Sequence, residues 1–434
     1  MEQGPSSILW RSEDHTVTVI DTPWSIAAAQ GTPEHPCHDE IASTEPITTP
    51  YAINEPKSEM AKQALAGQAV DSELHHEYEA LLAQALDQVR FHHSGPWHLP
   101  RYIFKKAQHV AKKRKLDAVD ESAASSLGSP ASGLADSAHV AGSPDEVPSA
   151  VSKTGLSAFD GMPMDATETY IFGSPYGMQS PSQLTVRNST GEPNVSFRIP
   201  QKSSFYLCDC ANLTDFHAAI RAQAEHLDTR RKFDFILLDP PWPNRSVKRT
   251  HKTADSTYAI VSSLNSVYDL VMGMDLDMLM ETDCLVGIWI TNKAQVRELV
   301  LGKDGIFACW GVELVEEWVW LKTTAVGEPV TAIDAVWRKP YEVLLLGRRR
   351  VSYEPAAATQ TKDKVTRRVI LGVPDLHSRK PCLKELIEPL MPDAINYRAL
   401  EGFARHLVAG WWSVGDQCIK YNWEGYWRPT QTIE

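Results

Sequence analysis

The second half of the chain alternates short apolar runs with stretches of helical spacing. Short apolar runs bounded by polar residues and prolines indicate buried strands. Their alternation with helices is typical of a mostly parallel sheet with helices on both faces. The pattern changes at Phe205, and the elements predicted after it are strands at 233–238, 284–290, 312–320, 341–346 and 368–371, helices at 293–301 and 383–391, and a last block at 400–404. The sequence therefore predicts an α/β, Rossmann-like domain over residues 203–434.

The first part of the chain has a different pattern. Residues 16–20 form a short apolar run that predicts a small strand, and residues 21–24 predict a turn after it. Near 72–93, apolar residues recur at helical spacing, and Ser72 can cap this helix. The helix is expected to pack one face on the rest of the protein. We assign residues 1–116 to an amino-terminal accessory region.

Two further segments join these regions. Residues 117–165 are rich in Ser, Ala, Gly and Pro and lack the apolar content that offsets the entropy of ordering, so they predict a disordered linker. Residues 166–202 form a connecting segment. The basic cluster at 105–115 suits an import receptor or phosphate groups, although a solvated charge run is an equal alternative. We expect a nuclear protein, with the cytosol as a second location.

Composition narrows the class of protein. The net charge of −12 argues against a protein that coats nucleic acid, so contacts with nucleic acid require local basic patches. Seven cysteines without a secretory signal predict free thiols in a reducing compartment. No apolar run approaches the roughly 18 residues of a membrane span. We therefore expect a soluble protein without a membrane partner.

The apolar run at 233–238 ends abruptly in Asp239, Pro240, Pro241 and Trp242. Neither proline can donate to a strand ladder, which leaves Asp239 at the carboxyl end of the strand, where open α/β sheets bind ligands. A carboxylate and a proline carbonyl both accept hydrogen bonds, so Asp239 and Pro240 could hold the hydrogens of an exocyclic amine. The indole of Trp242 could stack on a base, worth about 1–3 kcal/mol. The four residues predict group transfer to a planar amine, against the alternative of a structural proline turn.

With these four residues and the polar, basic continuation at 243–249, the sequence resembles the adenine-N(6) methyltransferases that carry Asp-Pro-Pro-Trp. Within that family it is most similar to the methyltransferase-like protein 4 branch, and the resemblance covers about residues 203–425. It implies a permuted motif order, in which the catalytic residues precede the donor-binding residues. It also implies S-adenosylmethionine as the donor, S-adenosylhomocysteine as the product, and no metal.

The resemblance assigns the first donor-binding residues. Cys208, Asp209 and Cys210 match a Cys-Asp pair whose acid lies near the adenine of the donor. Ser378 and Lys380 match a Ser-x-Lys-Pro element near the methionine carboxylate, where a cation makes physical sense. For both elements the alternative is a structural turn or a surface loop.

Further donor contacts are implied near the end of the chain, with Asp239 also beside the donor. Glu401 and Arg405 match an acid and an arginine beside the ribose. Asp416 and Gln417 occupy the place of a Gly-Asn-polar element, and Asp in place of Asn keeps an acceptor but loses two donors. The sequence has no Gly-x-Gly-x-x-Gly turn, which argues against a nicotinamide dehydrogenase.

The substrate is expected to be single-stranded or to have its target base flipped out, because a base inside a duplex cannot be reached. Arg348 to Arg350 form a weaker second basic patch. Contacts of basic residues with phosphates position a nucleic acid without specifying its sequence. The expected substrate-binding residues are Trp242 and the loop residues Asn244, Arg245, Ser246, Lys248 and Arg249, which continue into His251 and Lys252.

Several functional alternatives stay open at this level. The resemblance implies RNA as the substrate, especially a 2′-O-methylated adenosine in small nuclear RNA, with adenine in DNA as a rival. A catalytically inactive RNA-binding partner subunit would be expected to lose Asp239 or Trp242, but both are intact. A protein-amide methyltransferase and a nuclear scaffold are further rivals. A monomer is the expected state.

Overall fold

The computed structural model describes residues 6–52, 72–103, 170–173, 181–186, 195–243, 263–335, 339–350 and 365–429. The predicted linker at 117–165, the basic cluster at 105–115 and the basic loop at 244–252 lie outside these ranges. No helix in the described ranges has the length and apolar content needed to cross a bilayer.

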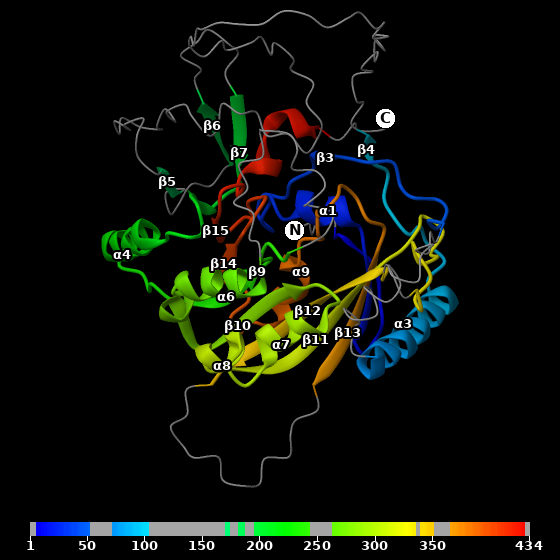
Figure 1. Ribbon diagram of the computed structural model, residues 1–434. Coiled ribbons are helices and arrows are strands. Elements are labelled where there is room, and N and C mark those ends of the chain that lie inside the picture. The colour runs from blue at the N-terminus through cyan, green and yellow to red at the C-terminus, as the bar shows by residue number, and fades with distance from the viewer. Residues whose placement is uncertain are drawn as a thin grey trace, which may run out of the picture.

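An 11-stranded sheet forms the centre of the molecule (Figure 1). Strands β1, β12 and β5 run antiparallel to their neighbours, and the remaining strands run in one direction. The protein therefore has the mixed α/β architecture with a mostly parallel sheet that the sequence predicts. In spatial order the strands are β1 (Ile8–Arg11), β2 (Val17–Ile20), β13 (Thr366–Gly372), β11 (Val312–Lys322), β12 (Tyr341–Arg349), β10 (Met280–Ile290), β9 (Phe233–Leu238), β14 (Ala399–Gly402), β15 (Trp411–Val414), β8 (Ser204–Leu207) and β5 (Tyr170–Gly173).

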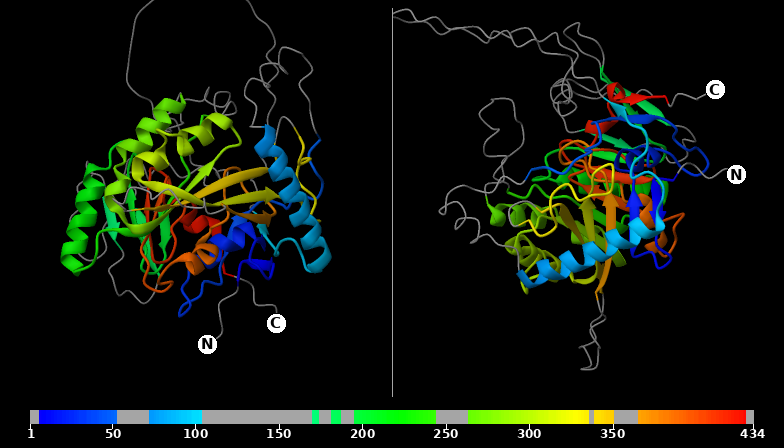
Figure 2. Two further views of the ribbon diagram at one scale, coloured as in Figure 1. Left: turned by 90° about the horizontal axis from the view of Figure 1, so that it is seen from below. Right: turned by 90° about the vertical axis from the view of Figure 1, so that its right-hand side faces the viewer.

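Helices cover both faces of this sheet (Figure 2). One face packs against α3 (Ser72–His92), α4 (Thr214–Leu227), α6 (Leu264–Gly273), α7 (Ala294–Leu301) and α8 (Ile306–Trp310). The other face packs against α1 (Thr22–Ala28), α9 (Lys384–Ile387) and the carboxyl-terminal residues. Each face buries its own apolar cluster, which explains why the central strands are nearly continuous apolar runs.

Smaller elements complete the described structure. A second sheet has the order β16 (Trp427–Arg428), β3 (Glu40–Ser43) and β4 (Tyr102–Ile103), and β6 (Ser182–Val186) pairs with β7 (Val195–Ile199). The short 3₁₀ helices are η2 (Leu276–Leu279), η3 (Glu388–Leu390), η4 (Lys420–Asn422) and η5 (Glu424–Tyr426). The predicted helix at 383–391 is thus α9 followed by η3.

The amino-terminal residues belong to the central sheet. Strand β2 lies parallel to β13, with Val19 beside Leu371, and β1 extends the same edge. The strand expected in an accessory region therefore forms one side of the domain core. The turn predicted at 21–24 is instead the start of α1, because the Asp21 side chain accepts the Trp24 N–H at 2.8 Å and caps the helix. The connecting segment also joins the sheet, since β5 pairs with β8 at the opposite edge.

The order of the strands creates a crevice beside β9. The chain leaves β9, passes through α6 and returns as β10 on one side, whereas β14 from the end of the chain lies on the other side. In this register Glu401 lies beside Leu237, and Gly402 lies beside Leu238. Open α/β sheets bind ligands where neighbouring connections diverge in this way. The sheet therefore brings Asp239 and Glu401 to one edge.

Candidate active site

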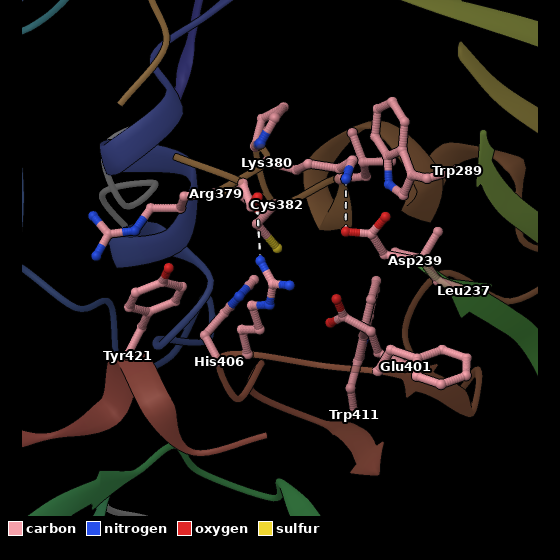
Figure 3. Close-up of a pocket in the computed structure, with 15 residues that line it drawn as sticks. Leu237, Asp239, Trp289, Arg379, Lys380, Cys382, Glu401, His406, Trp411 and Tyr421 are labelled. Carbon is pink, nitrogen blue, oxygen red and sulfur yellow. Dashed lines mark hydrogen bonds and ion pairs between the residues drawn. The ribbon is translucent and has the colours of Figure 1, made fainter. Parts of the chain in front are cut away.

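Asp239 lines a pocket at the carboxyl ends of β9 and β14 (Figure 3). The pocket and its open mouth enclose about 500 Å³. The Asp239 carboxylate accepts a hydrogen bond from Lys380 Nζ at 2.6 Å, and its side chain is 26% exposed. Asp239 is thus held at the strand end, next to a cavity, as its sequence position predicts. The residues that line the pocket are Leu237, Asp239, Trp289, Ser378, Arg379, Lys380, Pro381, Cys382, Leu383, Glu401, Phe403, Arg405, His406, Trp411 and Tyr421.

Lys380 also contacts a second acid, Glu342 of β12. The distance from Lys380 Nζ to Glu342 Oε2 is 3.4 Å, and Lys322 pairs with the other carboxylate oxygen. Burial opposes the charge of Glu342, but the Lys380 and Lys322 ammonium groups lower its pKa to about 2. The same two acids raise the pKa of Lys380 against the effect of its burial. Alternating charges therefore fix the ammonium group of Lys380 between Asp239 and Glu342.

Glu401 faces the same pocket from β14. Burial, and then the negative charge of Asp239, raise the pKa of Glu401 to about 8, and the cations Lys380 and Arg405 only partly oppose this shift. A carboxyl group that keeps its proton can donate a hydrogen bond as well as accept one. Perturbed acids of this kind gather at functional sites.

Arg405 and Ser378 both line the pocket and contact each other. Arg405 NH1 donates to the Ser378 carbonyl oxygen at 3.3 Å. Ser378 has a φ of 64°, a left-handed conformation that a serine adopts only where its surroundings impose it. The exposed Ser378 side chain pairs with His377 Nδ1 at 2.9 Å. The structure thus brings Asp239, Ser378, Lys380, Glu401 and Arg405 together in one pocket, and their roles in donor binding stay predictions.

The remaining donor-binding candidates lie at the ends of the neighbouring strands β8 and β15. Asp209 is exposed, and its side chain accepts the N–H of Ala211 at 2.9 Å. Burial, and then the charge of Asp209, raise the pKa of Asp416, while Arg405 lowers it. Asp416 therefore lies within electrostatic range of Arg405, which lines the pocket. Gln417 is half-buried beside Asp416.

Cys208 and Cys210 flank Asp209. Burial raises the pKa of Cys208 to about 12 and raises that of the buried Cys210 as well. Both thiols therefore keep their protons near neutral pH, whereas nucleophilic attack needs a thiolate. In the described part of the chain, no three His, Cys, Asp or Glu side chains gather as metal ligands.

Trp242 does not line the pocket. Its side chain is 9% exposed within the apolar cluster that faces α6, and its Nε1 donates to the Trp289 carbonyl oxygen at 2.7 Å. The Pro240 carbonyl accepts the Trp242 N–H at 2.8 Å, so one of its two lone-pair positions is used. Stacking of a base on Trp242 stays a prediction, and the indole that lines the pocket belongs to Trp289.

The predicted basic loop lies outside the described residues, with Asn244, Arg245, Ser246, Lys248 and Arg249. The weaker second patch lies away from the carboxyl ends of the strands, because Arg348 pairs with Leu285 in the middle of β10 and the chain runs on from there toward the start of β10. Arg348 NH1 donates to the Asp283 carbonyl oxygen at 3.1 Å, and Arg349 NH1 donates to the Met280 carbonyl oxygen at 3.2 Å. These arginines therefore support the structure at that end of the sheet.

Several residues in or next to the pocket were not predicted. Glu342, which contacts Lys380 from outside the pocket lining, carries a readable signal, since it is the one acid in the apolar run at 341–346. Trp289 and His406 carry none, because nothing local distinguishes them from core residues. Burial, and then Arg379, lower the pKa of His406 to about 4, so this imidazole is neutral at pH 7.

Comparison with known proteins agrees with this geometry. The MT-A70 family profile matches residues 233–417, from the start of β9 to the residues after β15. The N6-methyladenosine RNA methyltransferase MTA1 of Pyricularia oryzae is 30% identical over 441 residues, which cover 97% of this chain and 96% of the relative. The chain belongs to the MT-A70 family. It is an adenine-N(6) methyltransferase that acts on RNA or DNA.

Two other MT-A70 relatives align over about half of the chain. The N6-methyladenosine RNA methyltransferase MTA1 of Cryphonectria parasitica is 40% identical over 236 residues, 54% of this chain and 66% of the relative. The human N(6)-adenine-specific methyltransferase METTL4 is 33% identical over 242 residues, 54% of this chain and 46% of the relative. These matches are consistent with the methyltransferase-like protein 4 branch that the sequence resembles.

Proposed function

We propose that the pocket between β9 and β14 binds S-adenosylmethionine and presents its methyl group to the N6 amine of adenine in RNA. The observation that carries this proposal is the position of Asp239, held by Lys380 at the strand end and facing the same cavity as Glu401. MT-A70 methyltransferases generally use S-adenosylmethionine. The order of the residues along the chain, with Asp239 of β9 ahead of Glu401 of β14, supports a permuted arrangement.

The pocket residues suit this donor chemically. The carboxyl oxygens of Glu401 and Asp239 can accept hydrogen bonds from ribose hydroxyls or an ammonium group. Lys380 and Arg405 supply positive charge for a carboxylate. At the end of β15, Gly415 has a φ of 146°, and an added Cβ would lie 3.3 Å from Phe403 Cα, so a larger residue would push the backbone against the pocket wall.

The chain would act mainly by alignment and by acceptance of hydrogen bonds. The donor supplies a methyl group that its sulfonium already makes electrophilic. Asp239 and the free lone pair of the Pro240 carbonyl would accept the two amine hydrogens and draw the nitrogen lone pair out of the ring. Holding the amine in line with the methyl group would supply most of the remaining rate enhancement.

RNA is the favoured polymer because the relative that aligns along 97% of the chain is named an RNA methyltransferase. Within RNA, we favour adenosine or 2′-O-methyladenosine in small nuclear RNA, on the resemblance to the methyltransferase-like protein 4 branch. A nuclear location follows from the same proposal.

Calorimetry with S-adenosylhomocysteine and binding of an RNA oligonucleotide test the donor assignment. Glu401→Ala should weaken S-adenosylhomocysteine binding much more than RNA binding. Lys303→Ala, an exposed change outside the pocket, is the control and should alter neither affinity. Equal loss of both affinities in Glu401→Ala would contradict the donor assignment.

A further inference from the structure

The loop between β13 and α9, residues 373–383, carries much of the pocket wall. Ser378 and Lys380 both belong to it, and Lys380 is the residue that holds Asp239. The left-handed φ of Ser378 shows that the loop takes a conformation its own sequence does not favour. Contacts from outside the loop must therefore impose it.

Arg379 supplies one such contact. Its side chain and that of Lys380 extend in opposite directions, Lys380 toward Asp239 and Arg379 toward Tyr421 (Figure 3). The Arg379 guanidinium lies 4.1 Å from the centre of the Tyr421 ring, and NH1 donates to the Ala42 carbonyl oxygen at 2.8 Å. Because these contacts hold Arg379 in place, they also hold the adjacent backbone of Lys380.

Asp375 connects Arg379 to the amino-terminal segment. Its side chain is 0% exposed and forms an ion pair with Arg379, whose side chain is 1% exposed. The other carboxylate oxygen accepts Ser43 Oγ at 2.7 Å and the Thr44 N–H at 3.0 Å. Burial opposes the charge, but Arg379 and then the bonds from Ser43 and Thr44 lower the pKa of Asp375. The carboxylate is therefore charged and fully enclosed.

Arg101 holds the start of the same loop. Its NH2 donates to the Val373 carbonyl oxygen at 2.9 Å, and its NH1 donates to the Pro374 carbonyl oxygen at 3.0 Å and to that of Thr44 at 3.3 Å. At the other end, the Cys382 N–H donates to Ser25 Oγ of α1 at 2.9 Å. Residues from the first quarter of the chain thus hold the loop along its length.

We propose that Asp375 is a positioning residue that sets the donor pocket from the side away from the ligand. It acts through Arg379 and residues 42–44, and the places of Ser378 and Lys380 depend on it. The inference rests on the proposed function of the pocket. It also explains why the amino-terminal strands belong to the catalytic domain.

The test is Asp375→Asn in the full-length chain, a change that keeps an acceptor for Ser43 and Thr44 but removes the charge opposite Arg379. A buried guanidinium without its carboxylate should shift the loop, and displacements on the scale of 1 Å reduce rates by about 100-fold. We expect S-adenosylhomocysteine affinity to fall at least about tenfold and kcat by about 10- to 100-fold. Affinity for a single-stranded RNA oligonucleotide should stay unchanged.

Unfolding cannot mimic this split. An irreversibly unfolded fraction lowers the calorimetric stoichiometry, and reversible unfolding lowers the apparent affinities for the donor and for RNA alike. Asp393→Asn is the matched control, since Asp393 is an exposed carboxylate that caps a loop through Asn396. It should leave both affinities at the wild-type value. If Asp375→Asn does not fold, Ser43→Ala removes a single hydrogen bond to the same carboxylate. It should still lower the affinity for S-adenosylhomocysteine and leave the affinity for RNA unchanged.

Different results would overturn the positioning role of Asp375 and the proposed function of the pocket. Folded Asp375→Asn or Ser43→Ala with wild-type donor affinity and kcat would overturn the positioning role and leave the proposed function intact. A wild-type chain that binds no S-adenosylhomocysteine and methylates no RNA would overturn the proposed function itself.

Discussion

At the scale of single residues, two neighbouring carboxyl groups of the pocket have different surroundings. Asp239 has the Lys380 ammonium at 2.6 Å, whereas Glu401 is half-buried with the charge of Asp239 beside it. This difference holds Asp239 as an acceptor for an amine and leaves Glu401 as a group that can change its proton content when a ligand enters.

The raised pKa of Glu401 gives stability a specific pH dependence. Below about pH 4.5 this carboxyl is protonated in both the folded and the unfolded chain, and between that value and about 8 only the folded chain keeps the proton. The free energy of unfolding of the wild type should therefore fall across this window. Glu401→Gln should match the wild type at pH 5 and exceed its melting temperature at pH 8. Parallel melting curves for the two proteins across this range would contradict the assignment.

The place of Trp242 predicts a structural cost for its replacement. Trp242→Phe removes the bond to the Trp289 carbonyl oxygen and leaves that oxygen buried without this donor. Trp310→Phe is the matched control, because Trp310 is 3% exposed and its Nε1 has no hydrogen-bond partner among the described residues. In urea unfolding, the free energy of unfolding should fall by about 1 kcal/mol more in Trp242→Phe than in Trp310→Phe. Equal losses would show that the bond contributes nothing.

At the scale of elements, local pattern predicts most of the sheet but not its edges. Strand β9 is readable because an apolar run stops at two prolines, and α3 because apolar residues repeat at helical spacing. The first four residues of β10, Met280 to Asp283, are partly polar and were left out of the predicted strand. The pairing of β2 with β13 joins residues some 350 positions apart, which no local pattern reveals.

The packing of α3 on the sheet depends on a buried polar network. The Tyr78 hydroxyl donates to Glu317 Oε2 at 3.0 Å, and the same carboxylate pairs with Arg297 and Arg367. Tyr78→Phe should lower the free energy of unfolding by about 1–3 kcal/mol, since it removes a bond to a charged acceptor. Amide hydrogen exchange should show the loss first in α3. The exposed Tyr268→Phe serves as the control, and unchanged exchange in α3 would contradict this role for Tyr78.

At the scale of the molecule, some residues of the site are predictable from the sequence, and others are recognised only in the folded structure. Asp239, Lys380, Glu401 and Arg405 were predictable because each lies in a short pattern that the family shares. Asp375 and its partners at residues 42–44 were not, because their roles arise only when β3 packs behind the pocket loop. The burial of the Trp242 indole in the apolar cluster was not predictable for a related reason, since the sequence does not tell which face of the sheet receives it.

Removal of the amino-terminal region tests whether its strands and helices are needed for the domain to fold. A fragment of residues 200–434 lacks β1 and β2, which cover the β13 edge, and α1, α3 and β3, which cover the sheet faces and the pocket loop. We expect this fragment to bind hydrophobic dye and to lose cooperative unfolding and donor binding. A folded fragment that methylates RNA would show that the amino-terminal region is accessory after all.

The most direct test of the central claim is mass spectrometry of nucleosides from RNA and DNA incubated with the protein and isotopically labelled S-adenosylmethionine. The wild type should place the label on adenine N6, more in RNA than in DNA, and Asp239→Asn should place none while its melting temperature stays near that of the wild type. Label on another atom, or undiminished N6 methylation by Asp239→Asn, would contradict the account.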